Sequence, residues 1–224
     1  MKTTVIIPAA GMGTRMGCQK QLLPINGIPA LFRTLEIFSS HEEIDEIILV
    51  APRNISVKHF TKITAIVDGG SDRQASVYEG LKALSAETVN VLIHDGARPL
   101  VTPDIIADIL SYVRRGQAAI SGVRSKDTIK ITGLDNKIES TPHRDNTWLV
   151  QTPQGFPKEV ILAAHKKAIE EGFSNATDDG VLVERLGTPV FMVEGDYANI
   201  KLTTPQDIKI AEALLHMRDL DEGH

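Results

Sequence analysis

The sequence predicts a doubly wound α/β fold with a mostly parallel sheet, from which a β-hairpin arm protrudes. Short runs of β-branched residues alternate along the chain with amphipathic helical patterns. The runs are continuously apolar, which is typical of parallel strands covered by helices on both faces. One segment, residues 124–148, breaks this alternation and predicts the arm.

The predicted strands are short and apolar: residues 4–7, 46–50, 65–67, 89–93, 118–122 and 190–193. The predicted helices have a period near 3.6 residues: 30–39, 74–84, 103–115, 157–171, 178–186 and 205–217. Pro103, Pro157 and Pro205 suit first turns of helices, where the missing N–H costs nothing. Asp104 and Asp207 then lie where the helix dipole favours a carboxylate.

The arm is predicted from two strand-like stretches, residues 128–132 and 137–140, on either side of a Gly-Leu-Asp-Asn turn. An isolated two-stranded hairpin is marginal in water, so this one needs a surface to pack against. We expect it to grip a second copy of the chain, which predicts a homodimer. The alternative is a flap folded back on its own sheet.

Length and composition fit one domain over residues 1–224, with 42% hydrophobic and 24% charged residues. The net charge of −5 argues against non-specific attraction to nucleic acid or to anionic membranes. The first apolar run, residues 5–10, is too short to span a bilayer. A single cysteine, Cys18, excludes an internal disulfide and favours a reducing cytoplasmic location.

A glycine-rich loop follows the first predicted strand. Gly11 and Gly13 allow the backbone to approach a phosphate chain, and Arg15 and Lys20 add positive charge. The loop is neither a Walker loop nor a dinucleotide fingerprint, because the lysine-serine pair and the third glycine are missing. A tight strand-to-helix turn would explain the glycines, but not the two cations together.

The loop resembles the signature loop of sugar-phosphate nucleotidyltransferases, which have a Rossmann-like fold. Four further segments, in order and spacing, are similar to the 2-C-methyl-D-erythritol 4-phosphate cytidylyltransferase family: residues 68–77, 94–99, 151–156 and 199–203. The resemblance runs from the first strand to the last helix. It implies transfer of CMP from CTP to the phosphate of a small polyol phosphate, with release of pyrophosphate, in non-mevalonate isoprenoid synthesis.

Asp95 follows the apolar run 89–93 and so falls at the carboxyl end of a central strand, where open α/β sheets bind ligands. A carboxylate there would repel substrate phosphates unless a cation intervened, which predicts a magnesium (Mg2+) contact. A cap of the following turn is the alternative. We assign no proton transfer to His94.

The resemblance also implies which residues contact the two substrates. The expected CTP contacts are Ala9, Ala10, Gly11, Gly13, Gly70, Ser76 and Asp95. The expected contacts to the acceptor phosphate are Arg98, Thr128, Arg144, Thr152 and Lys201.

Four cations are expected to carry the chemistry. Arg15 and Lys20 would stabilise the transition state, while Arg144 and Lys201 would hold the attacking phosphate. Thr128 and Arg144 lie in or beside the arm, so we expect them to reach the partner subunit's site. A surface ion pair with the neighbouring aspartate is the alternative for Arg144. The stretch between Arg15 and Lys20 is shorter than in many family members.

Two rival functions remain open at this point. A cytidylyltransferase for ribitol 5-phosphate would share the chemistry, although its loop more often reads Ala-Gly-Gly, whereas residues 9–11 are Ala-Ala-Gly. A non-catalytic nucleotide-binding module would bind CTP without turnover. A dehydrogenase is disfavoured by the missing third glycine.

Overall fold

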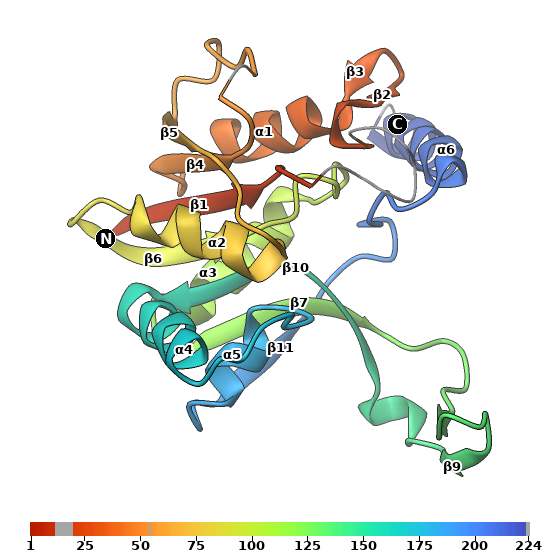
Figure 1. Cartoon of the computed structure of the whole chain (residues 1–224). Coiled ribbons are helices and arrows are strands. Elements are labelled where there is room, and N and C mark those ends of the chain that lie inside the picture. Colours follow the sequence, from red (N-terminus) through yellow and green to blue (C-terminus); the bar gives the residue numbers. More distant parts are fainter. Residues whose placement is uncertain (12–19, 54, 223–224) are drawn as a thin grey trace.

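A seven-stranded sheet forms the centre of the computed structural model, which describes residues 1–11, 20–53 and 55–222 (Figure 1). The strand order is β11-β7-β10-β6-β1-β4-β5. The bounds are β1 Lys2–Pro8, β4 Glu46–Val50, β5 Ile63–Val67, β6 Thr88–Ile93, β7 Ala118–Arg124, β10 Trp148–Pro157 and β11 Val190–Glu194. All six strands predicted for the sheet are present, and the doubly wound α/β prediction is confirmed.

The strand β10 was not predicted. It lies between β6 and β7 and runs antiparallel to both. Pro153 and Gly155 argue against a central strand in the sequence, because proline removes a ladder donor and glycine offers no side chain to pack. The structure accommodates Pro153 where the pairing with β7 is interrupted, between Val150 and Gln154.

The six predicted helices are present with shifted ends. Their bounds are α1 Ala30–Ser40, α2 Arg73–Lys82, α3 Pro103–Val113, α4 Lys158–Glu170, α5 Gly180–Glu184 and α6 Pro205–Glu222. Asp72 caps α2, its carboxylate accepting from the Ala75 amide at 2.8 Å. Pro157 ends β10 and occupies the N-cap of α4, so its predicted place inside the first turn is wrong.

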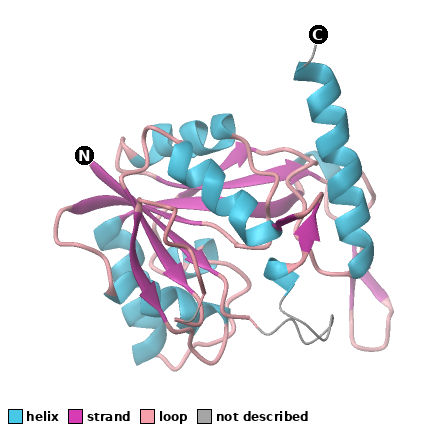
Figure 2. Cartoon of the chain, turned by 90° about the horizontal axis from the view of Figure 1, so that it is seen from above, coloured by secondary structure: helices cyan, strands magenta, loops and turns pink. Residues whose placement is uncertain are grey.

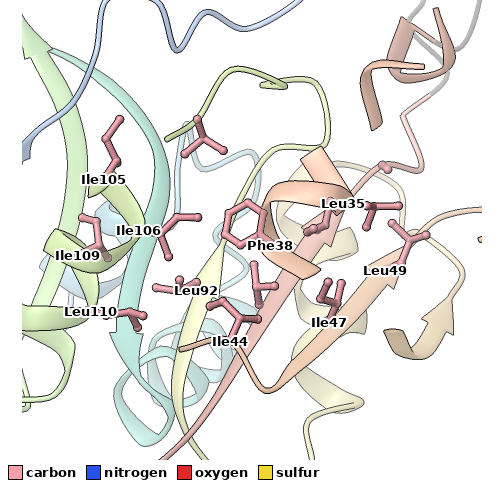
Figure 3. Packing of buried hydrophobic residues seen from close by; sticks show 14 of the residues in the cluster. Leu35, Phe38, Ile44, Ile47, Leu49, Leu92, Ile105, Ile106, Ile109 and Leu110 are labelled. Atoms are coloured by element: carbon pink, nitrogen blue, oxygen red, sulfur yellow. The ribbon is translucent and has the colours of Figure 1, made fainter. Parts of the chain in front are cut away.

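Alternating side chains of the strands divide the core into two layers. Val5 and Ile7 of β1 pack with residues of α1 and α3, whereas Ile6 packs with residues of α2, α4 and α5. Figure 3 shows the first layer, where Phe38 lies among aliphatic side chains from α1, α3 and the strands. Helices therefore cover both faces of the sheet, while the ends of the strands stay uncovered by them.

The arm leaves the sheet between β7 and β10. It carries β8 Ile131–Thr132 and β9 Ile138–Ser140, which pair with each other as a two-stranded sheet, and the short 3-10 helix η2 Arg144–Asn146. Figures 1 and 2 show this segment extending away from the seven-stranded sheet, so it is not the flap of the alternative prediction. Leu134 at its tip is fully exposed.

A third, smaller cluster joins the C-terminal helix to the rest of the chain. It contains Ile25 from β2 Pro24–Ile25, which pairs with β3 Ile28–Pro29, together with Leu202 before α6 and Ala211 of α6. The 3-10 helix η1, Lys20–Leu22, precedes β2. Among the helices of the described ranges, none has the length and apolarity needed to cross a membrane.

Candidate active site

A cavity of about 440 Å³ opens at the carboxyl ends of β1, β5 and β6. Its lining comes from loops that follow these strands, from the start of α2 and from the segment before α6: Pro8, Ala9, Ala10, Gly11, Gln21, Gly70, Ser71, Asp72, Arg73, Ser76, Asp95, Ala97 and Lys201. This is the sheet edge where open α/β folds bind ligands. The predicted residues Ala9, Ala10, Gly11, Gly70, Ser76, Asp95 and Lys201 all line it.

The loop after β1 is held in place by its backbone. The amide of Ala9 donates to the carbonyl of Val50 at 2.8 Å, which continues the ladder one residue beyond β1. The buried side chain of Gln21 donates to the carbonyls of Ala9 at 2.6 Å and Gly11 at 3.3 Å. Gln21 was not singled out from the sequence. The predictions for Gly13 and Arg15, and for the side chain of Lys20, lie outside the described residues.

Close packing brings the turn after β5 against this loop. A Cβ added to Gly69 would lie 2.3 Å from the Cβ of Ala10, so no side chain fits there. The amide of Gly70 donates to the Ser76 hydroxyl at 3.1 Å, and that hydroxyl donates to the carbonyl of Asp72 at 2.7 Å. Ser76 therefore shapes the wall of the cavity through the backbone of the turn.

Three cations converge on the buried carboxylate of Asp95. Its Oδ1 lies 3.1 Å from Nε of Arg73, while its Oδ2 lies 2.7 Å from Nζ of Lys201 and 3.8 Å from Nε of Arg98. Burial alone would raise the pKa of Asp95, but the attraction of Arg73 and Lys201 outweighs it and holds the pKa far below its usual range. The carboxylate is therefore ionised throughout the physiological range.

Arg73 was missed by the sequence reasoning, which noted only that a helix begins there. It is the first residue of α2 and also donates from Nη1 to Asp179 at 2.8 Å. Burial would lower the pKa of Arg73, but Asp179 and Asp95 raise it further above its already high value. A cation in a first helical turn opposes the helix dipole, and this was the signal available in the sequence.

His94 and Thr152 form a hydrogen-bonded link behind Asp95. His94 Nε2 lies 3.0 Å from the carbonyl oxygen of Arg98 and donates to it, because a carbonyl can only accept. The Asp95 amide donates to the Thr152 hydroxyl at 3.1 Å. That hydroxyl lies 3.1 Å from His94 Nδ1, to which it donates. Burial lowers the pKa of His94 to about 4, so the ring is neutral. Thr152 is only 4% exposed, and its hydroxyl orients the Asp95 backbone.

The predicted phosphate ligands Arg98 and Lys201 meet at this edge from two sides. Arg98 follows β6 and donates from Nη1 to the carbonyl of Asn199 at 2.7 Å. Its Nε is buried without a hydrogen-bond partner among the described residues. Burial lowers the pKa of Arg98 against the pull of Asp95. Lys201 follows β11 and keeps about a third of its side chain exposed.

Thr128 and Arg144 are not brought to the cavity of their own chain. Both are exposed and belong to the arm, which Figure 1 shows extending away from the strand ends that form the cavity. Among the ion pairs between described side chains, none involves Arg144, and Asp145 lies near His143 instead, at 3.7 Å. The surface ion pair with Asp145 considered for Arg144 is therefore absent from the described part of the chain.

The side chains at the cavity could hold a metal ion only together with phosphate oxygens of the substrates. Within the described ranges, no group of three or more His, Cys, Asp or Glu side chains could hold a metal ion. Asp95 supplies one carboxylate, and magnesium commonly uses one or two carboxylates together with substrate phosphate oxygens. Since Lys201 contacts Asp95 Oδ2, a metal ligated by that oxygen would have to share it with the ammonium or displace the ammonium.

A second cavity, of about 450 Å³, lies between α1 and α6. Phe32, Ile37, Phe60 and Leu215 make its walls largely apolar, although Arg33 and other polar side chains also reach it. Its lining includes none of the predicted ligand residues. The convergence of cations on Asp95 makes the first cavity the better phosphate site.

Comparisons with known proteins agree over nearly the full length. The family model described as 2-C-methyl-D-erythritol 4-phosphate cytidylyltransferase matches residues 3–217. Proteins of that name from Caldanaerobacter subterraneus subsp. tengcongensis and Alkaliphilus oremlandii are 46% and 44% identical to this chain. The first alignment covers 96% of this chain and 99% of the relative, and the second covers 97% and 96%.

Solved structures give the same result. The crystal structure of 4-diphosphocytidyl-2C-methyl-D-erythritol synthase from Anaerococcus prevotii matches with a TM-score of 0.86 at 36% identity, covering 96% of each chain. That of 2-C-methyl-D-erythritol 4-phosphate cytidylyltransferase from Thermus thermophilus matches with a TM-score of 0.79 at 36% identity, covering 96% of this chain and 98% of the other. The similarity thus includes the sheet, its helices and the strand ends that form the cavity.

Proposed function

Because the chain belongs to the 2-C-methyl-D-erythritol 4-phosphate cytidylyltransferase family, we propose that the cavity at the carboxyl edge of its sheet is the catalytic centre. The enzyme transfers CMP from CTP to the phosphate of 2-C-methyl-D-erythritol 4-phosphate and releases pyrophosphate, in isoprenoid precursor synthesis. The observation that carries the proposed site is the convergence of Arg73, Arg98 and Lys201 on Asp95 at the cavity.

The nucleotide occupies the side of the cavity formed by the loops after β1 and β5. Gly11 and Gly13 let the backbone approach the triphosphate, and Ala9, Ala10, Gly11, Gly70 and Ser76 contact the cytosine and ribose. Rigid strand ends with fixed backbone donors and acceptors suit recognition of a pyrimidine edge. The close contact between Gly69 and Ala10 supports this arrangement, because it brings the loops after β5 and β1 together at the same side of the cavity. Arg73 adds a cation to the same wall.

Asp95 is the proposed contact for magnesium. Its carboxylate would hold the metal together with the substrate phosphates, and the metal would offset part of their negative charge. Arrival of the acceptor phosphate gives Lys201 a second anionic partner, and the ammonium can then leave Asp95 Oδ2 free. The 35% exposure of the Lys201 side chain supports such a movement.

The acceptor phosphate binds beside Arg98 and Lys201. Thr152 contributes at this side, where its hydroxyl already supports the Asp95 amide. Thr128 and Arg144 of a second copy complete the pocket, because the arm that carries them extends away from its own cavity. The protein is therefore a homodimer held through residues 124–148, and residues 1–224 form one nucleotidyltransferase domain.

Positioning and electrostatics account for the reaction. A phosphate monoester is largely dianionic at neutral pH, since its second pKa is about 6, and it needs no general base. Its oxygen attacks the α-phosphorus of CTP in line, the bond to the bridging oxygen of pyrophosphate breaks, and pyrophosphate leaves with that electron pair. Arg15 and Lys20 stabilise the crowded phosphorus centre, while Arg144 and Lys201 hold the attacking group. Cys18 has no part in this scheme, and we place the enzyme in the cytoplasm.

The experiment that tests the proposal measures pyrophosphate release with CTP, magnesium and a panel of acceptors. Turnover is expected with 2-C-methyl-D-erythritol 4-phosphate and not with ribitol 5-phosphate. Replacing Lys201 with methionine should remove most of this turnover and raise the Michaelis constant for the acceptor. Full activity of that variant would refute the proposed acceptor site.

A further inference from the structure

A buried polar chain runs from the cavity into the layer between α2, α4 and α5. It begins at Asp95, passes through the guanidinium of Arg73 to Asp179, and ends at His165 of α4. The successive distances are 3.1, 2.8 and 3.2 Å. Asp179 and His165 are each 1% exposed and do not line the cavity, so neither can touch a substrate.

Asp179 is fixed from both its backbone and its side chain. Its amide donates to Oε1 of the buried Gln154 on β10 at 3.0 Å, and the next amide, that of Gly180, donates to the same oxygen at 3.2 Å. Its carboxylate accepts from His165 Nε2. His165 Nδ1 is buried without a hydrogen-bond partner in the described part of the chain. The imidazole therefore has its one hydrogen bond to Asp179, and its ring stacks on Tyr78 with 6.0 Å between centroids.

Such a chain is a costly way to fill a core. Removing ionised groups from water carries a penalty that well-packed apolar residues avoid, so a buried ion pair is weak support for stability alone. The core cluster around it consists of apolar side chains such as Val77, Ile161 and Leu182. The position of the charges at the cavity wall points to the reaction instead.

The geometry of Arg73 explains what Asp179 does. A guanidinium is planar and rigid, and two anchors on different nitrogens fix its orientation. Nε is held by Asp95 and Nη1 by Asp179. Without Asp179, Asp95 would be the only described side chain that holds the guanidinium, and the arginine could follow that carboxylate or turn toward the nucleotide phosphates. A displacement of about 1 Å at a reacting site can cost about 100-fold in rate.

We propose that Asp179 is a positioning residue for cytidylyl transfer: supported by His165, it orients Arg73, and through Arg73 it sets the place of Asp95 and of the nucleotide. This inference rests on the proposed function, in which Arg73 and Asp95 form the nucleotide side of the cavity.

The test is a double-mutant cycle with Asp179→Asn and Arg73→Gln in the full-length enzyme. Asp179→Asn keeps the shape of the side chain and removes its charge. We expect it to lower kcat/KM for CTP by about 100-fold, and to raise the dissociation constant of CTP in calorimetry. In the Arg73→Gln background the same change should cost less than about threefold, because the residue through which it acts is gone.

Two further variants separate positioning from folding. Glu46→Gln alters another largely buried carboxylate, which pairs with Lys2 at the opposite end of the sheet, and it should leave kcat/KM unchanged. If Asp179→Asn is too unstable to purify, His165→Phe replaces it, since a ring is kept against Tyr78 while the donor to Asp179 is removed. We expect His165→Phe to lower kcat/KM for CTP less than Asp179→Asn does. This loss should also disappear in the Arg73→Gln background.

The outcomes distinguish the inference from its premise. Equal losses for Asp179→Asn in both backgrounds, or no loss in the wild type, would overturn the positioning role while leaving the proposed site intact, provided that Arg73→Gln is itself impaired. If Arg73→Gln were fully active, the assignment of Arg73 to the nucleotide side would be wrong and the inference would fall with it.

Discussion

Replacing Asp95 with asparagine removes the one negative charge shared by three cations, and it should destabilise the nucleotide-free protein. Arg73 keeps its bond to Asp179, and Lys201 can return to water because about a third of its side chain is already exposed. Of the three cations, Arg98 would be left with the least compensation for the lost charge. Its side chain is only 12% exposed, and its Nε has no other partner among the described residues.

The size of the effect follows from these differences. Removing one member of a buried ion pair costs about 3–5 kcal/mol, and we expect the lower end because two of the three cations keep an alternative. For a chain of this length, each kcal/mol changes the melting temperature by roughly 2–4 °C. The melting temperature of Asp95→Asn should therefore lie about 6–12 °C below that of the wild type. Asp68→Asn breaks an exposed pair with Arg53 and should cost less than about 1 kcal/mol.

The low pKa of Asp95 also predicts how the stability difference between wild type and Asp95→Asn changes with pH. The folded-state pKa of Asp95 lies below the unfolded value of about 3.9, so its contribution is complete above that value and is lost as the pH falls through the folded pKa. The stability difference between wild type and Asp95→Asn, measured by urea unfolding, should be constant near neutrality and should shrink below about pH 4. Equal stability at pH 7, or a difference that grows on acidification, would refute the electrostatic reading of the site.

The remaining predictions concern catalysis and assembly. Arg15→Ala and Lys20→Ala should each lower kcat by more than about tenfold, which corresponds to ~1.4 kcal/mol of barrier, and a smaller loss would exclude a role in the transition state. Arg144→Ala should raise the Michaelis constant for the polyol phosphate far more than that for CTP, and equal changes would contradict its place at the acceptor. At a low concentration of the polyol phosphate, mixing the impaired Lys20→Ala and Arg144→Ala proteins should raise the activity above that of either alone, because a mixed dimer has one intact site, whereas no recovery would place Arg144 in its own subunit's site. Ile138→Asp should shift the mass in sedimentation toward the monomer if the arm forms the interface.

Local patterns predicted most of the fold. The alternation of apolar runs with helical periods gave the six parallel strands and six helices, and the break in that alternation gave the arm. The strand β10 was missed because its sequence contains Pro153 and Gly155, which argue against a central strand. In the structure Pro153 lies where the pairing with β7 is interrupted, whereas Gly155 pairs with both neighbouring strands. Strand order is likewise set by packing between distant segments.

In the candidate site, too, contacts that depend on packing between distant segments could not be predicted from the sequence. Asp95 and Lys201 could be predicted because both follow apolar strands, and the strand ends meet at one edge. Arg73 and Asp179 lie 106 residues apart, and their hydrogen bond depends on how α2 and α5 pack. Thr152 was predicted to contact the acceptor phosphate, which stays a prediction. Its hydrogen bond to the Asp95 amide could not be predicted, because that bond needs β10 beside β6.

A crystal structure with CTP and magnesium tests the central claim most directly, because the account depends on where the triphosphate lies. We expect the nucleotide in the cavity between residues 9–11 and Asp95, with its base at the turn of Gly70. A nucleotide bound between α1 and α6, or one bound with Arg73 and Lys201 directed away from it, would contradict the account.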